Sequence, residues 1–360
     1  MTTRLAEPVP ATAEYETGAC RPGDLAEVAA LLRSVFGVSH GPRHLHWKYF
    51  AAPLALPLCT VLRHRGRLVG FHGHQTQLWR RGDAEPVRVA FGMDIAALPE
   101  HRRIDTLLRM AGDSARRFAE HGVAWICGIP LPDMAELNTG LFGFTDTGSL
   151  PRQQRVLRVG RALARRGHPR LARLLGPATA CLRPGAPTVP ANLEIFRPTS
   201  FREMGSAWTT PASDCWQRVR DPDWLDWRHL HPVAPAQDVW ALRARGEASW
   251  MGWAAWSRRD DADGLRRAFL LDFGLRPGLG PREAALLPRQ VLREAHDAGC
   301  DSLEVRLSDE HPSAPVFRRL GFRPRPRARK TWHVLPLDPS LPLANLPRHW
   351  TLALADSDEP

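Results

Sequence analysis

Lysine is scarce in this chain of 360 residues, and its scarcity limits what the net charge means. The 49 basic residues include two lysines, Lys48 and Lys330, so that 47 are arginine (49 minus 2). This arginine excess, together with 33 prolines, indicates a coding bias. We therefore do not interpret the net charge of +11 as a signal for binding nucleic acid or a membrane surface.

Acidic side chains are missing from one long stretch. No Asp or Glu lies between Asp146 and Glu194, so this stretch carries a concentrated positive charge. Its arginines are Arg152, Arg155, Arg158, Arg161, Arg165, Arg166, Arg170, Arg173 and Arg183. The pattern predicts a basic, Pro-rich linker over residues 159–192, with one or two short helices interrupted near Pro169.

Long apolar runs and paired cysteines are also missing. There is no run of about 18 apolar residues that would predict a membrane span, and the N-terminal stretch lacks the apolar core of a signal peptide. The six cysteines lie far apart, without a Cys-x-x-Cys pair or a metal-like cluster. We expect a cytoplasmic protein with reduced thiols, no membrane span and no metal site.

The stretch from Phe91 to Phe144 carries the clearest pattern in the sequence. It predicts a strand ending near Leu98, an amphipathic helix closed by Gly122, a second strand, and a further short helix before Gly143-Phe144. The helix is expected to bury one stripe, made of Ile104, Leu107, Leu108, Ala111, Ala115 and Phe118. This order of elements resembles the acyl-CoA-binding core of the GCN5-related N-acetyltransferase (GNAT) family.

An internal repeat strengthens the resemblance. Five features recur in the same order at offsets of 176 to 180 residues, which indicates a duplication. The pairs are Arg21-Pro22 with Arg197-Pro198, Trp47 with Trp227, Pro99 with Pro277, Gly122 with Gly299, and Gly143-Phe144 with Gly321-Phe322. The predicted fold is α+β (mixed αβ), with two tandem GNAT-like domains, each a twisted mixed sheet flanked by helices.

The predicted domain boundaries follow from the repeat. The first GNAT-like domain is expected over residues 15–158 and the second over residues 193–335. Residues 145–159 are expected to complete the first sheet. Residues 1–14 are expected to be disordered, and residues 336–360 to form a tail that runs out over the surface.

The resemblance also implies where an acyl-CoA donor would bind. In the family, backbone N–H groups of the turn after the central strand, and the start of the following helix, hold the pyrophosphate. In this chain Arg103, Asp105 and Leu107 stand where the family favours glycine. The tyrosine that protonates the departing thiolate in the family falls on Thr139, and on Phe317 in the second copy. The implied donor-binding residues are Ile95, Ala97, Arg102, Arg103, Ile104, Thr106 and Thr139.

Candidate general bases lie on the predicted strands. Asp94 on the central strand is the first candidate, and Asp272, 178 residues later, and Glu304 are its equivalents in the second copy. His72 and His74 have i, i+2 spacing, which places both rings on one face of a strand. An imidazole suits proton transfer near neutral pH. A solvent-facing strand surface is the plainer interpretation of the two histidines, and both interpretations stay open.

These residues support one favoured function and two alternatives. The favoured function is transfer of an acyl group from acetyl-CoA or another acyl-CoA to a small-molecule primary amine, such as an amino sugar or another biosynthetic intermediate. A Fem-like transferase that uses aminoacyl-tRNA is the first alternative, in which the Arg-rich stretch contacts the tRNA. No nucleic-acid partner is expected otherwise. A catalytically silent GNAT pair that serves as a binding or assembly module is the second alternative.

Overall fold

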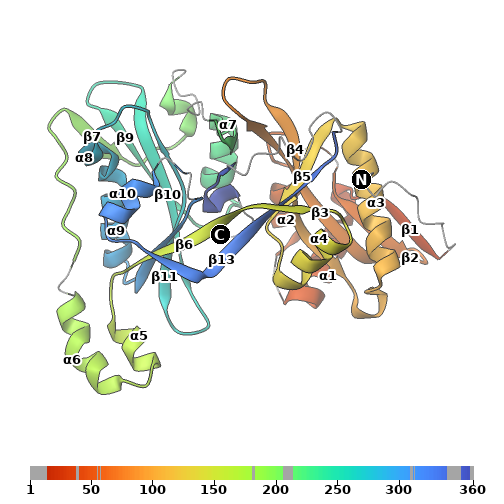
Figure 1. The fold of residues 1–360 in the computed structure, drawn as a ribbon, viewed down its shortest axis with the longest axis horizontal. Coiled ribbons are helices and arrows are strands. Elements are labelled where there is room, and N and C mark those ends of the chain that lie inside the picture. The colour runs from red at the N-terminus through yellow and green to blue at the C-terminus, as the bar shows by residue number, and fades with distance from the viewer. Residues whose placement is uncertain are drawn as a thin grey trace. The chain divides into compact units, whose positions relative to one another are not determined.

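The computed structural model describes residues 14–37, 40–54, 56, 58–180, 183–205, 214–308, 311, 313–338 and 350–356. The chain divides into two compact units, which we describe separately (Figure 1). Unit 1 contains Met1–Gly148, Asp214–Val219 and Thr331–His349, and unit 2 contains Ser149–Ser213, Arg220–Lys330 and Trp350–Pro360. Apart from Glu14, the residues predicted to form a disordered N-terminus lie outside the described ranges.

Unit 1 is a mixed sheet with helices on both faces. Its strands lie in the order β1-β2-β3-β4-β5-β13, with β4 and β5 parallel and the neighbouring pairs β1–β2, β2–β3, β3–β4 and β5–β13 antiparallel. The strands are β1 (Tyr15–Ala19), β2 (Thr60–His64), β3 (Arg67–Arg80), β4 (Val87–Ala97), β5 (Val123–Gly128) and β13 (Arg323–Pro336), with β8 (Trp216–Arg218) beside β3.

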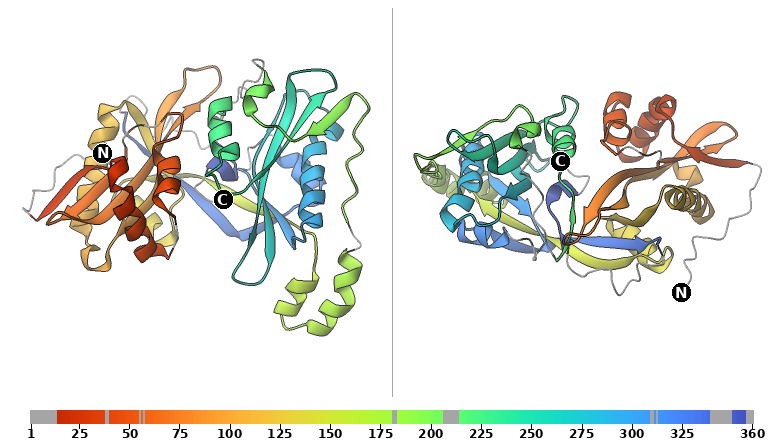
Figure 2. Two further views of the ribbon diagram at one scale, coloured as in Figure 1. Left: turned by 180° about the vertical axis from the view of Figure 1, so that it is seen from behind. Right: turned by 90° about the horizontal axis from the view of Figure 1, so that it is seen from above.

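The helices of unit 1 lie on opposite faces of this sheet. The pair α1 and α2 covers one face and α3 the other (Figure 2, right). The helices are α1 (Leu25–Phe36), α2 (Pro42–Tyr49), α3 (Ile104–Glu120) and α4 (Pro132–Gly140), with 3-10 turns η2 (Pro22–Asp24) and η3 (Pro99–His101). The predicted strand, helix, strand and short helix between Phe91 and Phe144 are therefore all present.

The buried stripe of α3 agrees with the predicted one at Phe118 and differs from it elsewhere. The side chains that α3 buries are Thr106, Met110, Ser114 and Phe118, whereas Ile104 is 60% exposed. Two of the four are polar, so a search for apolar residues cannot find this stripe. Ser114 is accommodated because its hydroxyl lies 3.0 Å from the hydroxyl of Thr60 on β2.

Unit 2 repeats the strand order of unit 1. Its strands lie in the order β6-β12-β11-β10-β9-β7, with β11 and β12 parallel. They are β6 (Thr145–Val156), β7 (Leu193–Phe196), β9 (Asp238–Ala244), β10 (Trp250–Asp260), β11 (Arg266–Leu275) and β12 (Ser302–Arg306). The mixed class with helices flanking each sheet, predicted from the sequence, is confirmed.

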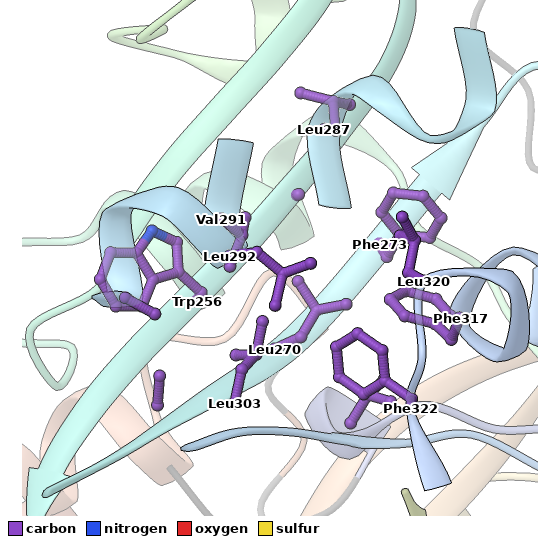
Figure 3. Close-up of a cluster of buried hydrophobic side chains, with 14 of the residues drawn as sticks. Trp256, Leu270, Phe273, Leu287, Val291, Leu292, Leu303, Phe317, Leu320 and Phe322 are labelled. Carbon is purple, nitrogen blue, oxygen red and sulfur yellow. The ribbon is translucent and has the colours of Figure 1, made fainter. Parts of the chain in front are cut away.

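The core of unit 2 lies between this sheet and two helices. Trp256, Leu270 and Leu303 from the strands pack against α9 and α10 (Figure 3). The helices are α5 (Gly160–Arg165), α6 (Pro169–Ala180), α7 (Pro222–Leu225), α8 (Pro281–Ala284), α9 (Leu286–Asp297) and α10 (Ala314–Arg319). Unit 2 also contains the π-helix η5 (Asp226–Leu230), the 3-10 turns η4 (Phe201–Met204) and η7 (Leu354–Asp356), and the short strand β14 (Trp350–Thr351).

Each unit receives its sixth strand from the other half of the sequence. β6 follows unit 1 along the chain, yet Arg152–Val156 pair with β12 of unit 2. β13 follows α10 of unit 2, yet His333–Pro336 pair with β5 of unit 1. The expectation that residues 145–159 complete the first sheet is therefore wrong for their second half. The boundaries predicted from the repeat, 15–158 and 193–335, stay a prediction.

The end of the described chain is buried. We call Trp350–Asp356 the C-terminal segment. Leu352 is 0% exposed, and Leu354 packs against Phe269 and Leu271 of β11. The expectation that residues 336–360 run over the surface is wrong for this segment, because its apolar side chains have a place in the core of unit 2.

The Arg-rich stretch forms the two short helices predicted for it, α5 and α6. Several of its arginines are neutralised by carboxylates of unit 2. The ion pairs are Arg152 with Glu304, Arg161 with Asp301, Arg165 with Asp263, and Arg183 with Asp297. The concentrated charge expected from the sequence is therefore partly cancelled. Among the described residues, no helix is long and apolar enough to cross a membrane.

Candidate functional site

Asp94 on β4 is the centre of the candidate site in unit 1. Its Oδ2 atom accepts hydrogen bonds from Lys48 Nζ at 2.8 Å and from Tyr49 Oη at 2.5 Å, both at the end of α2. The side chain of Lys48 is 7% exposed and that of Asp94 21% exposed. The ion pair is thus largely withdrawn from water, while the carboxylate of Asp94 can still be reached from outside.

The electrostatic surroundings keep Asp94 ionised. Burial alone would raise the pKa of this carboxyl group, because burial disfavours the charged form. The positive charge of Lys48 and the hydrogen bonds from Lys48 and Tyr49 outweigh burial, and the pKa of Asp94 lies below its ordinary value. A carboxylate that is ionised at neutral pH can bind an ammonium group and accept one of its protons as the amine reacts.

Two features of β3 position the end of α2 above Asp94. The ring of Tyr49 lies directly against Gly73, since a Cβ atom at Gly73 would come within 2.4 Å of the Tyr49 hydroxyl. Gln75 Nε2 donates to the carbonyl of Lys48 at 3.1 Å, and Arg218 Nη2 donates to Gln75 Oε1 at 3.2 Å. Neighbouring strands therefore fix both partners of Asp94.

His72 and His74 lie on the opposite face of the sheet, against α3. Their ring centroids are 4.0 Å apart, and His72 Nδ1 lies 3.3 Å from Ser114 Oγ. His74 packs edge-on against Phe118. Burial lowers the pKa of His72 to about 4 and lowers that of His74 well below its ordinary value. The structure places both rings on one face, as predicted, but the sheet separates them from Asp94.

The turn after β4 has the strand–turn–helix form that the donor-binding prediction requires. β4 ends at Ala97 and α3 begins at Ile104. Arg102 Nε donates to the carbonyl of Ala97 at 3.0 Å. Arg103 Nε lies 3.0 Å from Asp105 Oδ1, so the aspartate that stands at a glycine position of the family is neutralised within the turn.

Thr106 and Thr139 use their hydroxyl groups within the protein. Thr106 is buried, and its Oγ1 lies 2.8 Å from the carbonyl oxygens of both His101 and Arg103, so that its single O–H can donate to either of them. It therefore stabilises the turn from inside. Thr139 on α4 is exposed and donates to the carbonyl of Ala135 at 3.0 Å, one turn earlier in the same helix. The hydroxyl of Thr139 is therefore engaged within its own helix, unlike the free phenol of the tyrosine that the family has at this position.

The two isoleucines of the predicted donor site flank the turn. Ile95 lies on β4 opposite His72, so its side chain faces α3 and not α2. Ile104 begins α3 and is largely exposed. The structure thus gathers Ala97, Arg102, Arg103 and Ile104 around the start of α3, with Asp94 on the other face of the same strand.

β4 and β5 diverge where two glycines come together. The parallel ladder between them ends at Phe91 and Cys127, although β4 continues to Ala97. Directly after the last pair come Gly92 and Gly128, and a Cβ atom at Gly128 would lie 3.2 Å from the carbonyl oxygen of Gly92. Among the described residues, no strand pairs with the β5 side of β4 beyond this point. Its free backbone groups can bind an extended ligand.

In unit 2, the counterpart Asp272 is sealed. Arg220 Nε donates to both of its carboxylate oxygens at 2.9 and 3.0 Å, and Arg220 Nη2 donates to Asp356 at 2.9 Å. His229 Nε2 lies 3.5 Å from Asp272 Oδ2. Burial opposes ionisation, yet Arg220 and His229 hold the pKa of Asp272 well below its ordinary value. The side chains of Asp272 and Asp356 are 0% exposed, which leaves no access for a ligand.

Glu304, the second equivalent in this unit, is an ion-pair partner within the sheet. It lies on β12, is buried, and pairs with Arg152 on the neighbouring β6. Burial raises the pKa of Glu304 in spite of this arginine. Its surroundings are those of a structural cross-strand pair.

The divergence of β11 and β12 is occupied by the chain itself. The ladder between these strands ends at Leu270 and Val305. Just beyond β12, Leu307 forms a bridge with Ala353 of the C-terminal segment. Leu354 of the same segment packs against β11. Counting from the matched aspartates, Gly92 of unit 1 corresponds to Leu270, so unit 2 has a large side chain where unit 1 has none.

Comparison with known proteins identifies the fold. No known family profile matches the sequence, and no curated protein matches it. Solved structures match over most of the chain. The N-myristoyltransferase of Saccharomyces cerevisiae with bound myristoyl-CoA matches with a TM-score of 0.62 at 10% identity, over 92% of this chain and 80% of that chain. The chain has a GNAT-type fold.

Two further structures share this GNAT-type fold. A GCN5-related N-acetyltransferase from Anabaena variabilis matches with a TM-score of 0.59 at 10% identity, over 90% of this chain and 73% of that chain. A conserved Enterococcus faecalis protein of unknown function, described as a probable N-acyltransferase, matches with a TM-score of 0.61 at 10% identity, over 90% of this chain and 72% of that chain.

In the described part of the chain, no group of three or more His, Cys, Asp or Glu side chains is arranged to hold a metal ion.

The partners of Asp94 were not among the predicted site residues. A signal for them exists in the repeat, because Trp47-Lys48-Tyr49 recurs as Trp227-Arg228-His229. In both units the third residue of this motif approaches the aspartate of the central strand. Pairing of Asp272 with Arg220 and Asp356 has no comparable signal, since the three residues are far apart in sequence.

Proposed function

We propose that this protein is an acyl-CoA-dependent N-acyltransferase that acylates a primary amine, and that unit 1 performs the reaction. The reaction class is supported by a fold shared with N-acyltransferases. The observation that carries the proposal is the accessible, ionised carboxylate of Asp94 on the stretch of β4 that has no partner on its β5 side.

The donor is an acyl-CoA bound where β4 and β5 diverge. Neither Gly92 nor Gly128 places a side chain there, and within the described chain β4 has no partner strand on its β5 side beyond Phe91, so an extended chain can hydrogen-bond to β4. Arg102, in the turn before α3, provides positive charge for the donor's phosphates, in addition to the N–H groups of the first helical turn, while Arg103 neutralises Asp105, which would otherwise repel them. A neighbouring structure holds myristoyl-CoA, so acyl chains from acetyl to myristoyl are the donors to compare.

Asp94 binds the ammonium form of the acceptor and takes one proton from it, so that the neutral amine attacks the thioester carbonyl, and the second proton leaves the nitrogen to solvent as the amide forms. A C–N bond forms, the C–S bond breaks, and coenzyme A leaves as a thiolate that is protonated from solvent. Lys48 and Tyr49 are positioning residues, because they hold the carboxylate ionised and oriented. The acceptor is a small-molecule primary amine, and an amino sugar is the first one to test.

Unit 2 has an architectural role in this proposal. Its central-strand aspartate is enclosed by Arg220, and its strand divergence is filled by the C-terminal segment. A donor could enter only by displacing buried side chains. We therefore assign one donor site to each chain.

A thermal shift experiment tests the proposal. The chain is heated with acetyl-CoA, octanoyl-CoA or myristoyl-CoA, with free coenzyme A and bulk tRNA as comparisons. A ligand that binds the native state at about 100 times its Kd stabilises it by about 2.7 kcal/mol, so the midpoint rises with acyl-CoA concentration. No shift with any acyl-CoA at about 1 mM contradicts the proposal. A shift with tRNA alone supports the Fem-like alternative.

A further inference from the structure

An open cavity in unit 2 shares no lining residue with either aspartate site. Its volume is about 520 Å³, within the range of small-ligand pockets. The end of β6, α9, the end of α10 and the linker residues 184–186 form its walls. Neither the turn after β11 nor the C-terminal segment contributes to it. The lining residues are Arg155, Pro184, Gly185, Ala186, Arg289, Leu292, Arg319, Leu320 and Gly321.

The charged side chains of this lining all have the same sign. Arg155, Arg289 and Arg319 come from three different elements, and the lining includes no carboxylate. In the described part of the chain, none of the three forms an ion pair with Asp or Glu. By contrast, Arg183, which directly precedes the lining residue Pro184 in sequence, pairs with Asp297. Three uncompensated guanidinium groups around one cavity form an attractive site for a multiply charged anion.

One of the three arginines is already fixed in place. Arg155 is half-buried, and its Nη1 donates to the carbonyl of Leu320 at 2.6 Å. Burial, and the like charge of Arg289, lower the pKa of Arg155. A bound anion would relieve this repulsion, since it places negative charge between the two guanidinium groups. Arg289 and Arg319 are exposed, so they can close on a ligand without breaking an existing ion pair.

We propose that this cavity binds a small phosphate-bearing molecule, with Arg155 as a fixed anchor and Arg289 and Arg319 as a clamp. A guanidinium group suits this ligand because its planar donors match two phosphate oxygens at once. The site is separate from the proposed donor site, because it lies in unit 2 and the proposed donor site lies in unit 1. It therefore does not depend on the proposed acyl transfer.

Titration calorimetry with inorganic pyrophosphate tests this site on the full chain. The test variant is Arg289→Gln with Arg319→Gln. The matched control is Arg282→Gln with Arg318→Gln, which removes the same charge from exposed positions on α8 and α10 outside the cavity. We expect the unchanged protein and the control to bind alike, and the test variant to bind at least about tenfold more weakly, because each substitution removes a charge-assisted hydrogen bond.

Four results would overturn the proposal. The first is that no heat of binding is measured at about 10 mM pyrophosphate, and the second is that the control binds pyrophosphate as weakly as the test variant. The third is that saturating acyl-CoA abolishes pyrophosphate binding, and the fourth is that the protein binds tRNA but not pyrophosphate. The third would mean that the cavity receives the phosphates of the acyl donor. The fourth would mean that the arginines contact nucleic acid. Binding that persists beside acyl-CoA and is lost only in the test variant supports the proposal.

Discussion

The aspartate of the central strand is the residue at which the two units differ most. Asp94 is accessible and held by one lysine and one phenol, whereas Asp272 is fully enclosed by an arginine, a histidine and the C-terminal segment. A carboxylate that must meet a substrate needs access, and one that only stabilises the fold does not. We therefore expect the aspartate at this position to take part in the reaction in unit 1, as Asp94, and to stabilise the fold in unit 2, as Asp272.

Replacing Asp94 by Asn should lower kcat/KM for acyl transfer by about 100-fold or more, the size of a lost general-base contribution. The double variant Lys48→Met with Asp94→Asn separates chemistry from structure, because it leaves no unpaired buried lysine. If Asp94 is the base, the double variant stays inactive although its thermal stability recovers. Recovery of activity would show that Asp94 acts only through folding. Asp133→Asn, an exposed site on α4, is the control.

Stability should fall as the pH drops from about 6.5 to about 4, because of buried histidines. The folded-state pKa of His72 is about 4, below the unfolded value of about 6.5, so the unfolded chain binds the proton first. This one histidine should therefore account for about 3 kcal/mol of lost free energy of unfolding, and the loss levels off below pH 4. Urea unfolding at several pH values measures the slope.

The variant His72→Asn should reduce that slope, and His168→Asn, at an exposed position, should leave it unchanged. An identical slope in all three proteins would show that His72 is not buried as a neutral ring. Asp94 and Asp272 contribute mainly at and below the lower end of this range, since an unfolded carboxyl group titrates near pH 4 and the pKa of each group is lower still in the folded chain.

At the scale of elements, the C-terminal segment is the piece that closes unit 2. Asp356 should anchor it, because this carboxylate is 0% exposed and shares Arg220 with Asp272. The variant Asp356→Ala removes one partner of a buried charge and should cost about 3 to 5 kcal/mol in the free energy of unfolding.

The matched control for this prediction is Asp223→Ala, which removes the partner of Arg202 from an exposed ion pair. It should cost about 1 kcal/mol or less. Chemical denaturation of both variants measures the difference. Equal costs would mean that the segment does not depend on its ion pair with Arg220.

Local elements could be predicted from the sequence, and contacts between distant segments could not. The end of β4, the length of α3 and the turn at Gly122 follow from neighbouring residues, so they were predicted. The buried polar side of α3 depends on Thr60, which lies 54 residues from Ser114. The burial of Asp356 depends on Arg220, 136 residues away. Such pairs leave no local pattern.

The candidate site, too, could be predicted from the sequence only in part. Asp94 could be found because its type and strand position suit a base, and because it recurs as Asp272. The repeat marks Lys48 and Tyr49 as a recurring motif, but they could not be assigned to Asp94, since nothing in the sequence gives the register between α2 and β4. The histidines were placed on one face by their spacing, but the spacing does not tell which helix covers that face.

At the scale of the whole molecule, the exchanged strands should make each half of the chain dependent on the other. A fragment of residues 1–158 carries β6 but lacks β13, so the edge of β5 is left unpaired and prone to aggregate. We expect this fragment to lack a cooperative thermal transition. Joining residues 331–338 to residue 148 through a flexible linker should restore one. Cooperative unfolding of the unmodified fragment would contradict this account.

The central claim is that one acyl-CoA binds per chain, where β4 and β5 diverge. Titration calorimetry with the acyl-CoA that gives the largest thermal shift tests it directly. The account predicts one site per chain, lost in Gly128→Val, whose side chain would meet the carbonyl of Gly92, and kept in Gly18→Val, where nothing lies within 4 Å of the added atom. Two sites per chain, or unchanged binding in folded Gly128→Val protein, would contradict the claim.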